Sequence, residues 1–362
     1  MPAARRRLPP DPVPTTLVRF LVPGTSGKFR CGGLSVELQT ARILSGLCPT
    51  EIVTYREQRN DCPFLDDLLQ RGPVGDHVLW IVSWGFDVPR LLNRLRGQRV
   101  AYHAHSSGYG FDLPPGVPVL AVSRNTLGYW GDRAPRNPLF LVPNALEPQW
   151  LERGDRGDAS GRHRPIDVLV QARKSSDYVL GDLVPALRSR GLTVEVQSGW
   201  VDDLVDLFNS ASVYLYDSAD YWRGRGVTEG FGLPPLEAMA CGCVVFTSFN
   251  HALADHCDPG RSAHQIGCGS LSHDLQRIQA AVAEPLHWRP PASELGLLLN
   301  SSSESRLQER WREVLEDLDQ LQRQWSRGDV LSSPPTWRLR ARQILQRARR
   351  VVDRLPGWPK RV

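Results

Sequence analysis

The 362-residue chain lacks several features that assign a protein to a class at once. No apolar run reaches about 18 residues, so the sequence predicts no transmembrane helix. The basic, proline-rich start has no apolar segment behind it, and we expect residues 1–15 to be a disordered lead rather than a signal peptide. With 41% hydrophobic and 23% charged residues, the composition is typical of a soluble globular protein with two cores.

Cysteine is scarce and scattered. The seven cysteines include no Cys-x-x-Cys pair, and no histidines cluster with them at ligand spacing, so the sequence predicts no metal site. An odd number of cysteines at irregular spacing is typical of free thiols in a reducing compartment. We therefore expect a cytoplasmic protein.

The net charge of +5 is unevenly distributed. Residues 337–362 hold eight Arg, one Lys and one Asp, which leaves −3 for the rest of the chain. The apolar positions between Trp337 and Leu355 fit one helical face, so residues 327–362 are expected to be a basic amphipathic tail. Such a tail either binds the anionic inner face of a membrane or packs as a final helix. Nucleic acid is not expected as a partner, because aromatic interleaving is absent and the body is acidic.

Strand-like and helix-like patterns alternate along residues 16–150 and again along residues 166–300. This alternation predicts an α/β protein with a parallel sheet in each half. Between the halves, residues 151–165 contain little to bury and are expected to be a linker. Residues 301–326 carry apolar side chains at helical spacing, and from there the chain enters the basic tail.

The first half opens with a strand over residues 17–23, a glycine-rich loop that ends in Gly32 and Gly33, and a helix. Strand, glycine loop and helix are typical of a nucleotide-binding unit, although neither the dinucleotide spacing nor a Walker lysine is present. A later strand over residues 100–105 contains His103 and His105, which alternation places on the same strand face.

The most informative stretch runs from Gly226 to Gly242. Its glycines allow close approach of the backbone to a ligand, and two prolines then mark the first turn of a short helix that ends at Gly242. A glycine-rich loop that leads into a helix N-terminus can bind anions or sugar hydroxyls through its amides. Two carboxylates, Glu229 and Glu237, lie at either end of this loop and helix.

The block from Glu229 to Gly242 resembles the E-x7-E motif of the retaining glycosyltransferases of the GT-B fold, in the glycogen-synthase-like and mannosyltransferase-like group. Weaker resemblances follow in the same order as in that family, at residues 121–123, 142–145 and 211–215. The similarity covers roughly residues 16–285. It implies two Rossmann-like domains that face each other across a cleft, plus C-terminal helices, with the donor mainly on the second domain and the acceptor mainly on the first. It also implies that the helix over residues 301–326 is a crossing helix, which runs back toward the first domain.

The resemblance also implies roles for residues of the second half. Glu237 resembles the carboxylate that accepts hydrogen bonds from the donor ribose, and Glu229 resembles the one that holds the transferred sugar. Backbone amides would bind sugar hydroxyls and pyrophosphate, and they belong to Gly230, Phe231, Gly232 and Leu233. Arg173 and Lys174 resemble the diphosphate-binding cations, but they are adjacent here, whereas the family separates them by several residues.

In the first half, Gly32 and Gly33 resemble the glycine loop over the diphosphate. His105 resembles the histidine that contacts the donor sugar, and His103 is its competitor for that role. The absence of an Asp-x-Asp motif in a plausible loop agrees with diphosphate binding by cations and amides instead of metal.

The implied activity is retaining, metal-independent transfer of a hexose-type sugar from a UDP- or GDP-sugar to a glycan or glycolipid acceptor, as in polysaccharide biosynthesis. No cofactor is expected beyond the nucleotide-sugar substrate. The alternative is a catalytically inactive protein of the same fold that binds sugar nucleotides or docks on membranes. No residue in the sequence identifies the donor base, the sugar, the acceptor or the oligomeric state.

Overall fold

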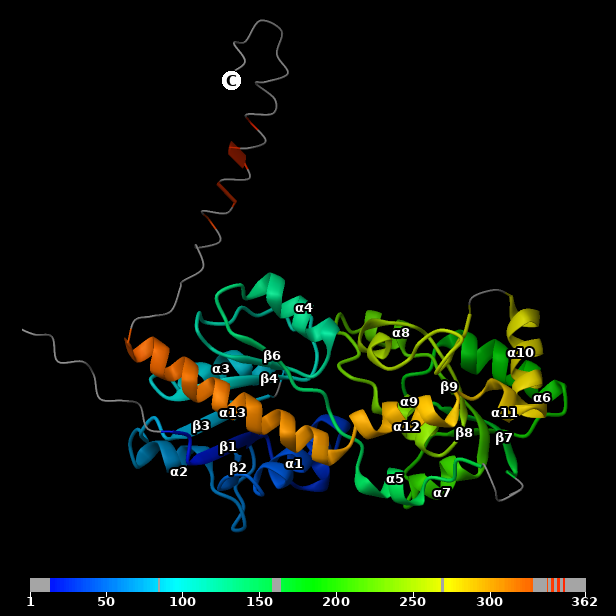
Figure 1. Ribbon diagram of the computed structural model, residues 1–362, viewed down its shortest axis with the longest axis horizontal. Helices are drawn as coiled ribbons and strands as arrows, with labels where there is room; N and C mark the ends of the chain where they lie inside the picture. Colours follow the sequence, from blue (N-terminus) through cyan, green and yellow to red (C-terminus); the bar gives the residue numbers. More distant parts are fainter. Residues whose placement is uncertain are drawn as a thin grey trace, which may run out of the picture.

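The computed structural model describes residues 14–83, 85–157, 164–267 and 270–327, together with six residues of the tail: 337, 340, 341, 344, 345 and 348. Two α/β domains lie next to each other, each built around one parallel sheet, and a long helix, α13 (Glu304–Arg327), lies across the first domain (Figure 1). The predicted architecture of two Rossmann-like α/β domains with C-terminal helices is confirmed.

The first domain has a six-stranded sheet in the order β2-β1-β3-β4-β5-β6, with every neighbouring pair parallel. The central strand β3 is a continuous, fully buried apolar run because both faces of the sheet are covered. The strands are β1 (Leu17–Val22), β2 (Thr50–Thr54), β3 (Val78–Val82), β4 (Arg99–Ala104), β5 (Val119–Ala121) and β6 (Leu139–Leu141).

Helices α1 and α13 cover one face of this sheet, and α2, α3 and α4 cover the other. Ser123 caps α4 by accepting a hydrogen bond from the amide of Thr126. The helices, with two short 3-10 turns, are η1 (Gly27–Phe29), α1 (Gly32–Leu44), α2 (Leu65–Gln70), η2 (Gly85–Asp87), α3 (Val88–Arg94) and α4 (Arg124–Arg133).

The second domain has a five-stranded parallel sheet in the order β11-β10-β9-β7-β8. Its strands are β7 (Ile166–Gln171), β8 (Val194–Gln197), β9 (Ala211–Tyr216), β10 (Val244–Thr247) and β11 (His264–Gln265). The helices are α5 (Pro148–Arg153), η3 (Tyr178–Leu183), α6 (Val184–Ser189), α7 (Leu204–Asn209), α8 (Ala219–Arg223), α9 (Leu233–Ala240), η4 (His251–Asp255), α10 (Leu271–Ala283), α11 (Pro285–Trp288) and α12 (Ala292–Ser301).

Strand order reverses once in each sheet, between β1 and β3 and between β7 and β9. In open parallel sheets, ligands bind at the carboxyl ends of the strands at such a reversal. The loop after β1 leads to Gly32 and Gly33, the loop after β7 contains Arg173 and Lys174, and the segment after β9 contains Glu229. The fold therefore brings the predicted site residues to the two reversal points.

The chain enters the second domain earlier than the sequence predicts. Helix α5 contains residues 148–153, of which 151–153 fall in the expected linker, and it packs against α7 and α9. The cause is Trp150, which is buried with its ring 5.5 Å from that of Phe208. Residues 158–163 of the linker lie outside the described residues.

Two further predictions concern the ends of the chain. The disordered lead at residues 1–15 falls outside the described residues except for Pro14 and Thr15. The membrane or packing role of the basic tail falls on residues 327–362, of which few are described. Among the residues that are described, no helix has the length and apolar character needed to cross a bilayer.

Trp311 on α13 joins the crossing helix to the first domain. It is fully buried, and its ring lies 6.1 Å from Phe20 of β1. We expect Trp311→Ala to lower the free energy of unfolding by about 3–5 kcal/mol, because the substitution leaves a cavity under the helix. Urea denaturation measures this loss, and Glu316→Ala, at an exposed position of the same helix, serves as the control with a change within about 0.5 kcal/mol. Equal effects of the two substitutions would refute this account of α13.

Candidate functional site

The loop before α9 approaches the first domain and ends in a tight turn. Gly232 adopts φ +82° and forms the N-cap of α9, a conformation that a side chain would strain. Pro234 and Pro235 follow in the first turn, where amide donors are not needed, and Phe231 is buried in the core below the loop. Gly242 ends the helix with φ +70°, as the sequence predicts.

Glu229 is buried at the start of this loop and is held by three side chains. The Tyr216 hydroxyl donates to its carboxylate at 2.6 Å and the Trp222 indole N–H donates at 2.7 Å. The ammonium group of Lys174 lies 3.4 Å from the other carboxylate oxygen. The carboxylate is thereby compensated and fixed in orientation, as a buried charge requires.

The two predicted cations differ in placement. Lys174 adopts φ +76°, and its ammonium group lies 4.8 Å from the centre of the Trp222 ring, so it is part of the Glu229 cluster. Arg173 is exposed and forms no hydrogen bond or ion pair with the residues that the structure describes. Because Lys174 directly follows Arg173, it does not fit the family's spacing of the two cations. In the structure, however, Lys174 is the one of the two that lies next to Glu229.

Glu237 lies on α9, and its carboxylate accepts no hydrogen bond within the described part of the chain. The pKa of Glu237 is raised to about 8, mainly by burial and also by charge repulsion from Glu147, while Lys174 acts in the opposite direction. In contrast to Glu229, this carboxylate keeps its hydrogen-bonding capacity for a ligand.

The second domain touches the first through the same loop. A Cβ atom on Gly230 would lie 1.5 Å from the carbonyl oxygen of His105, so only glycine fits there. The Ser106 hydroxyl donates to the carbonyl of Thr228 at 2.6 Å, and the hydroxyls of Ser107 and Thr228 lie 2.7 Å apart. The predicted partners from the two domains, His105 and the Gly230 loop, are therefore in direct contact.

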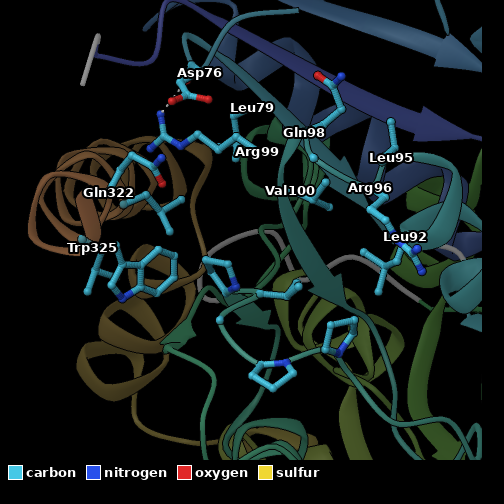
Figure 2. A pocket seen from close by; sticks show the side chains of 18 of the residues that line it. Asp76, Leu79, Leu92, Leu95, Arg96, Gln98, Arg99, Val100, Gln322 and Trp325 are labelled. Atoms are coloured by element: carbon cyan, nitrogen blue, oxygen red, sulfur yellow. Dashed lines mark hydrogen bonds between the residues drawn. The ribbon is translucent and has the colours of Figure 1, made fainter. Parts of the chain in front are cut away.

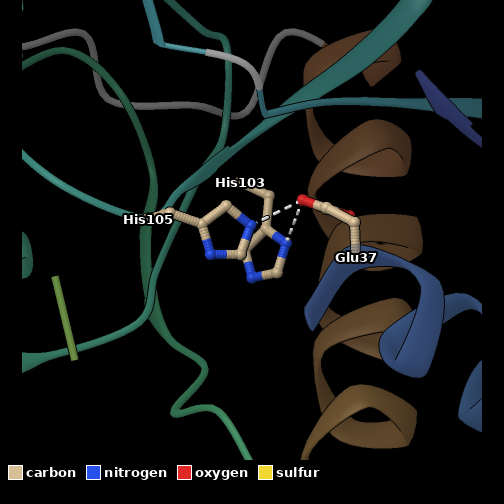
Figure 3. A group of neighbouring side chains, drawn as sticks. All are labelled: Glu37, His103 and His105. Carbon is tan, nitrogen blue, oxygen red and sulfur yellow. Dashed lines mark hydrogen bonds and ion pairs between the residues drawn. The ribbon is translucent and has the colours of Figure 1, made fainter. Parts of the chain in front are cut away.

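His103 and His105 lie at the end of β4, and both rings point at Glu37 of α1 (Figure 3). His103 is 1% exposed, and His105, which faces the second domain, is 16% exposed. Gly32 and Gly33 begin α1, and an added Cβ would meet nothing within 4 Å at Gly32 and only the Cys31 sulfur at Gly33. Open space therefore lies above the glycine loop.

Sequence reasoning did not identify Glu37, Tyr216 or Trp222. Glu37 lies three positions after Leu34 and four before Ala41, on the buried face of an amphipathic helix. A lone carboxylate on an apolar helix face is a detectable signal for a buried partner, but the sequence does not specify which partner.

A cavity of about 800 Å³ lies elsewhere in the first domain, between the amino end of β4 and the end of α13 (Figure 2). Its walls include Leu92, Pro115, Leu318 and Trp325. None of the predicted donor-binding residues lines it. Those residues lie in the segments that follow the carboxyl ends of the strands.

Comparison with known proteins finds one family model that matches part of the chain. Residues 189–262, which include Glu229 and Glu237, match the family model described as glycosyl transferases group 1. No curated protein matches the sequence significantly.

Several solved structures share the fold. Anabaena HepE in complex with UDP and glucose is 13% identical, with a TM-score of 0.58 over 83% of this chain and 100% of that one. A glycosyltransferase from Rickettsia africae is 9% identical, with a TM-score of 0.61 over 84% and 98%. Sucrose-phosphate synthase from Thermosynechococcus elongatus is 14% identical, with a TM-score of 0.55 over 86% and 99%. The fold is GT-B, and together with the family match it supports a glycosyltransferase.

The raised pKa of Glu237 makes stability depend on pH. Between its ordinary pKa of 4.5 and about 8, the folded protein binds more protons at this group than the unfolded chain does, so its contribution to stability falls as pH rises. We expect the thermal midpoint of the wild type, relative to Glu237→Gln, to decline from pH 5 to pH 8 and then level off. Thermal scans at stepped pH measure this. Glu195→Gln, at an exposed position of the same domain, should show a constant difference, and a constant difference for Glu237→Gln would contradict the expectation.

Proposed function

We propose that this protein transfers a sugar from a UDP- or GDP-sugar to a glycan or glycolipid acceptor, with retention of anomeric configuration and without a metal ion. The observation that carries the proposal is the placement of Glu229 and Lys174 beside the loop that leads into α9, the helix that contains Glu237. The same loop contacts His105 of the other domain. The solved complexes of Anabaena HepE with UDP and glucose and with UDP-glucose support a nucleotide-sugar donor.

Binding of the diphosphate follows from charge and geometry. The amides of residues 230–233 lie at the loop and first turn of α9, and a helix N-terminus favours anions. Lys174 carries a positive charge beside Glu229, and Arg173 lies exposed in the same loop, with no partner among described side chains. As the sugar–phosphate bond breaks, these groups stabilise the negative charge that develops on the leaving phosphate.

The two carboxylates have separate tasks in this proposal. Glu237, with no hydrogen-bond donor supplied by the described chain, accepts from the ribose hydroxyls. Glu229, fixed by Tyr216 and Trp222, holds a sugar hydroxyl and orients the ring for attack by the acceptor. Retention and metal independence follow from the resemblance to retaining enzymes with the E-x7-E motif, and we assign no side chain as a nucleophile.

A donor panel tests the proposal. UDP-, GDP- and ADP-sugars are incubated with the full-length protein and a set of glycan and glycolipid acceptors, and release of the nucleotide is followed together with binding by thermal shift. We expect turnover of one of the UDP- or GDP-sugars and at least a tenfold weaker nucleotide affinity for Glu237→Ala, because loss of a hydrogen-bond partner in a buried site costs about 1–3 kcal/mol.

Glu195→Ala is the matched control and should behave as wild type, since Glu195 is exposed on β8. Nuclear magnetic resonance of the product anomer in the presence of EDTA examines retention and metal independence in the same reaction. The proposal fails if no donor is bound or consumed, and binding without turnover would identify an inactive sugar-nucleotide-binding protein.

We also propose that the basic tail attaches the protein to an anionic membrane surface, with the catalytic domains in the cytoplasm. The support is its charge of +8 across residues 337–362. Each basic residue near such a surface contributes about 1 kcal/mol.

Liposome flotation with and without residues 337–362 measures the role of the tail. We expect the full-length protein to float with anionic vesicles, to stay unbound with neutral ones, and to lose binding on truncation. Equal binding of the two forms to anionic vesicles would rule out the tail as the attachment site.

A further inference from the structure

The side chain of Glu37 on α1 contacts His103 in β4 and His105, which directly follows β4, in the interior of the first domain (Figure 3). His103 Nδ1 lies 2.9 Å from Oε1 of Glu37, and His105 Nε2 lies 2.7 Å from the same oxygen. The Glu37 side chain is 1% exposed. One carboxylate oxygen therefore accepts from both rings.

If this cluster served only to stabilise the fold, burial of its carboxylate would carry a desolvation cost. The rest of the buried face of α1 is largely apolar and packs into a core with Leu34, Ala41 and Leu44 among its members. Replacing buried ionic groups by apolar side chains is often neutral or stabilising, so packing alone does not require a carboxylate at this position. Burial acts to raise the pKa of Glu37, but charge and hydrogen bonding from His103 and then His105 bring it below its ordinary range.

The two histidines differ in what their remaining nitrogens can reach. His103 Nε2 is buried and has no hydrogen-bond partner in the described residues, and its ring packs 5.7 Å from Trp311. His105 is partly exposed, and its backbone contacts Gly230 of the donor loop. In Figure 3 the second ring nitrogen of His105 points away from Glu37. His105 is thus the ring with a free nitrogen at the domain interface.

We propose that Glu37 is a positioning residue for recognition of the donor sugar: its Oε1 accepts the Nε2–H of His105 and leaves the unprotonated Nδ1 of His105 to accept a hydrogen bond from a sugar hydroxyl. The inference rests on the proposed function, because it assigns a further residue to the same donor site. In this arrangement Glu37 selects the tautomer and fixes the ring, and His105 makes the contact. The site then favours a sugar with a hydroxyl at that position over the deoxy analogue, which would leave Nδ1 without a donor.

The first test reads the tautomer directly. Histidine-selective 15N labelling of the full-length protein, with assignment by His105→Ala and His103→Ala, distinguishes protonated from unprotonated ring nitrogens. We expect His105 to carry its proton on Nε2 in the wild type and to lose this preference in Glu37→Met. A His105 ring that is protonated on Nδ1, or on both nitrogens, overturns the inference.

The second test is a double-mutant cycle with the UDP- or GDP-sugar that the wild type turns over. We expect Glu37→Met to lower kcat/KM roughly tenfold to a hundredfold, and Glu37→Gln, which keeps an acceptor oxygen, to retain most of the activity. Affinity for free UDP or GDP should not change. In the His105→Ala background, Glu37→Met should have no further effect, because its influence passes through that ring.

Glu304→Met is the matched control. Glu304 also accepts hydrogen bonds from two side chains, Gln39 and Arg42 of α1, but it does not contact either histidine. Additive effects in the cycle, or an equal loss for Glu304→Met, would show a merely structural role and overturn the inference.

The same three side chains offer ligand atoms within 4.8 Å of one another, as a metal site requires. Elemental analysis of the purified protein resolves this: zinc bound to the wild type and absent from Glu37→Met overturns the inference. If no sugar nucleotide is bound or consumed, the proposed function fails whatever the tautomer. If a donor is consumed and the tautomer or the cycle disagrees, only this inference fails.

Discussion

The two domains meet backbone to backbone at Gly230 and His105, and the candidate site depends on that contact. Any Cβ at position 230 would overlap the His105 carbonyl. The contact brings the end of β4 within reach of the loop that precedes α9, and the hydroxyls of Ser106, Ser107 and Thr228 extend it. A glycine that resembles a sugar-binding element in the sequence therefore also sets the spacing between the domains.

Much of the second domain's site could be predicted from sequence because its determinants are local. The loop from Glu229, the left-handed turn before α9, the two prolines and the terminal Gly242 follow one another within a short stretch, and each has a conformational reason. Predicted limits are less accurate where the chain is irregular. The helical segment after β7, for example, begins as the π-helical turn η3 and continues as α6.

The partners of the charged groups could not be predicted in this way. Glu37 and His105 are 68 positions apart, and Lys174 and Glu229 are 55 apart. Each pair lies within one domain, so which side chains meet depends on the order of the strands in its sheet, and that order is not encoded in a local pattern. The structure begins the second domain before the linker that the sequence predicts, for a related reason: Trp150 belongs to a core formed mainly by residues far along the chain.

The buried carboxylates of the two domains divide into two kinds. Glu229 and Glu37 each receive at least two donors from the chain, so their orientation is fixed before any ligand arrives. Glu237 receives none from the described residues, and burial shifts its pKa upward instead. The protein thus fixes the orientation of Glu229 and Glu37 through its own hydrogen bonds, and it leaves Glu237 able to form hydrogen bonds with a ligand.

The chain passes between the domains twice, before α5 and before α13, and the two passages are joined by a hydrogen bond from the Leu146 amide to the Ser302 carbonyl. Two covalent connections at one place form a joint that permits rotation but little sliding. Any relative motion of the domains would then be a rotation about residues 146 and 302. Side chains near this joint would move little and those far from it would move most, so the spacing between the domains would be set by an angle rather than by a translation.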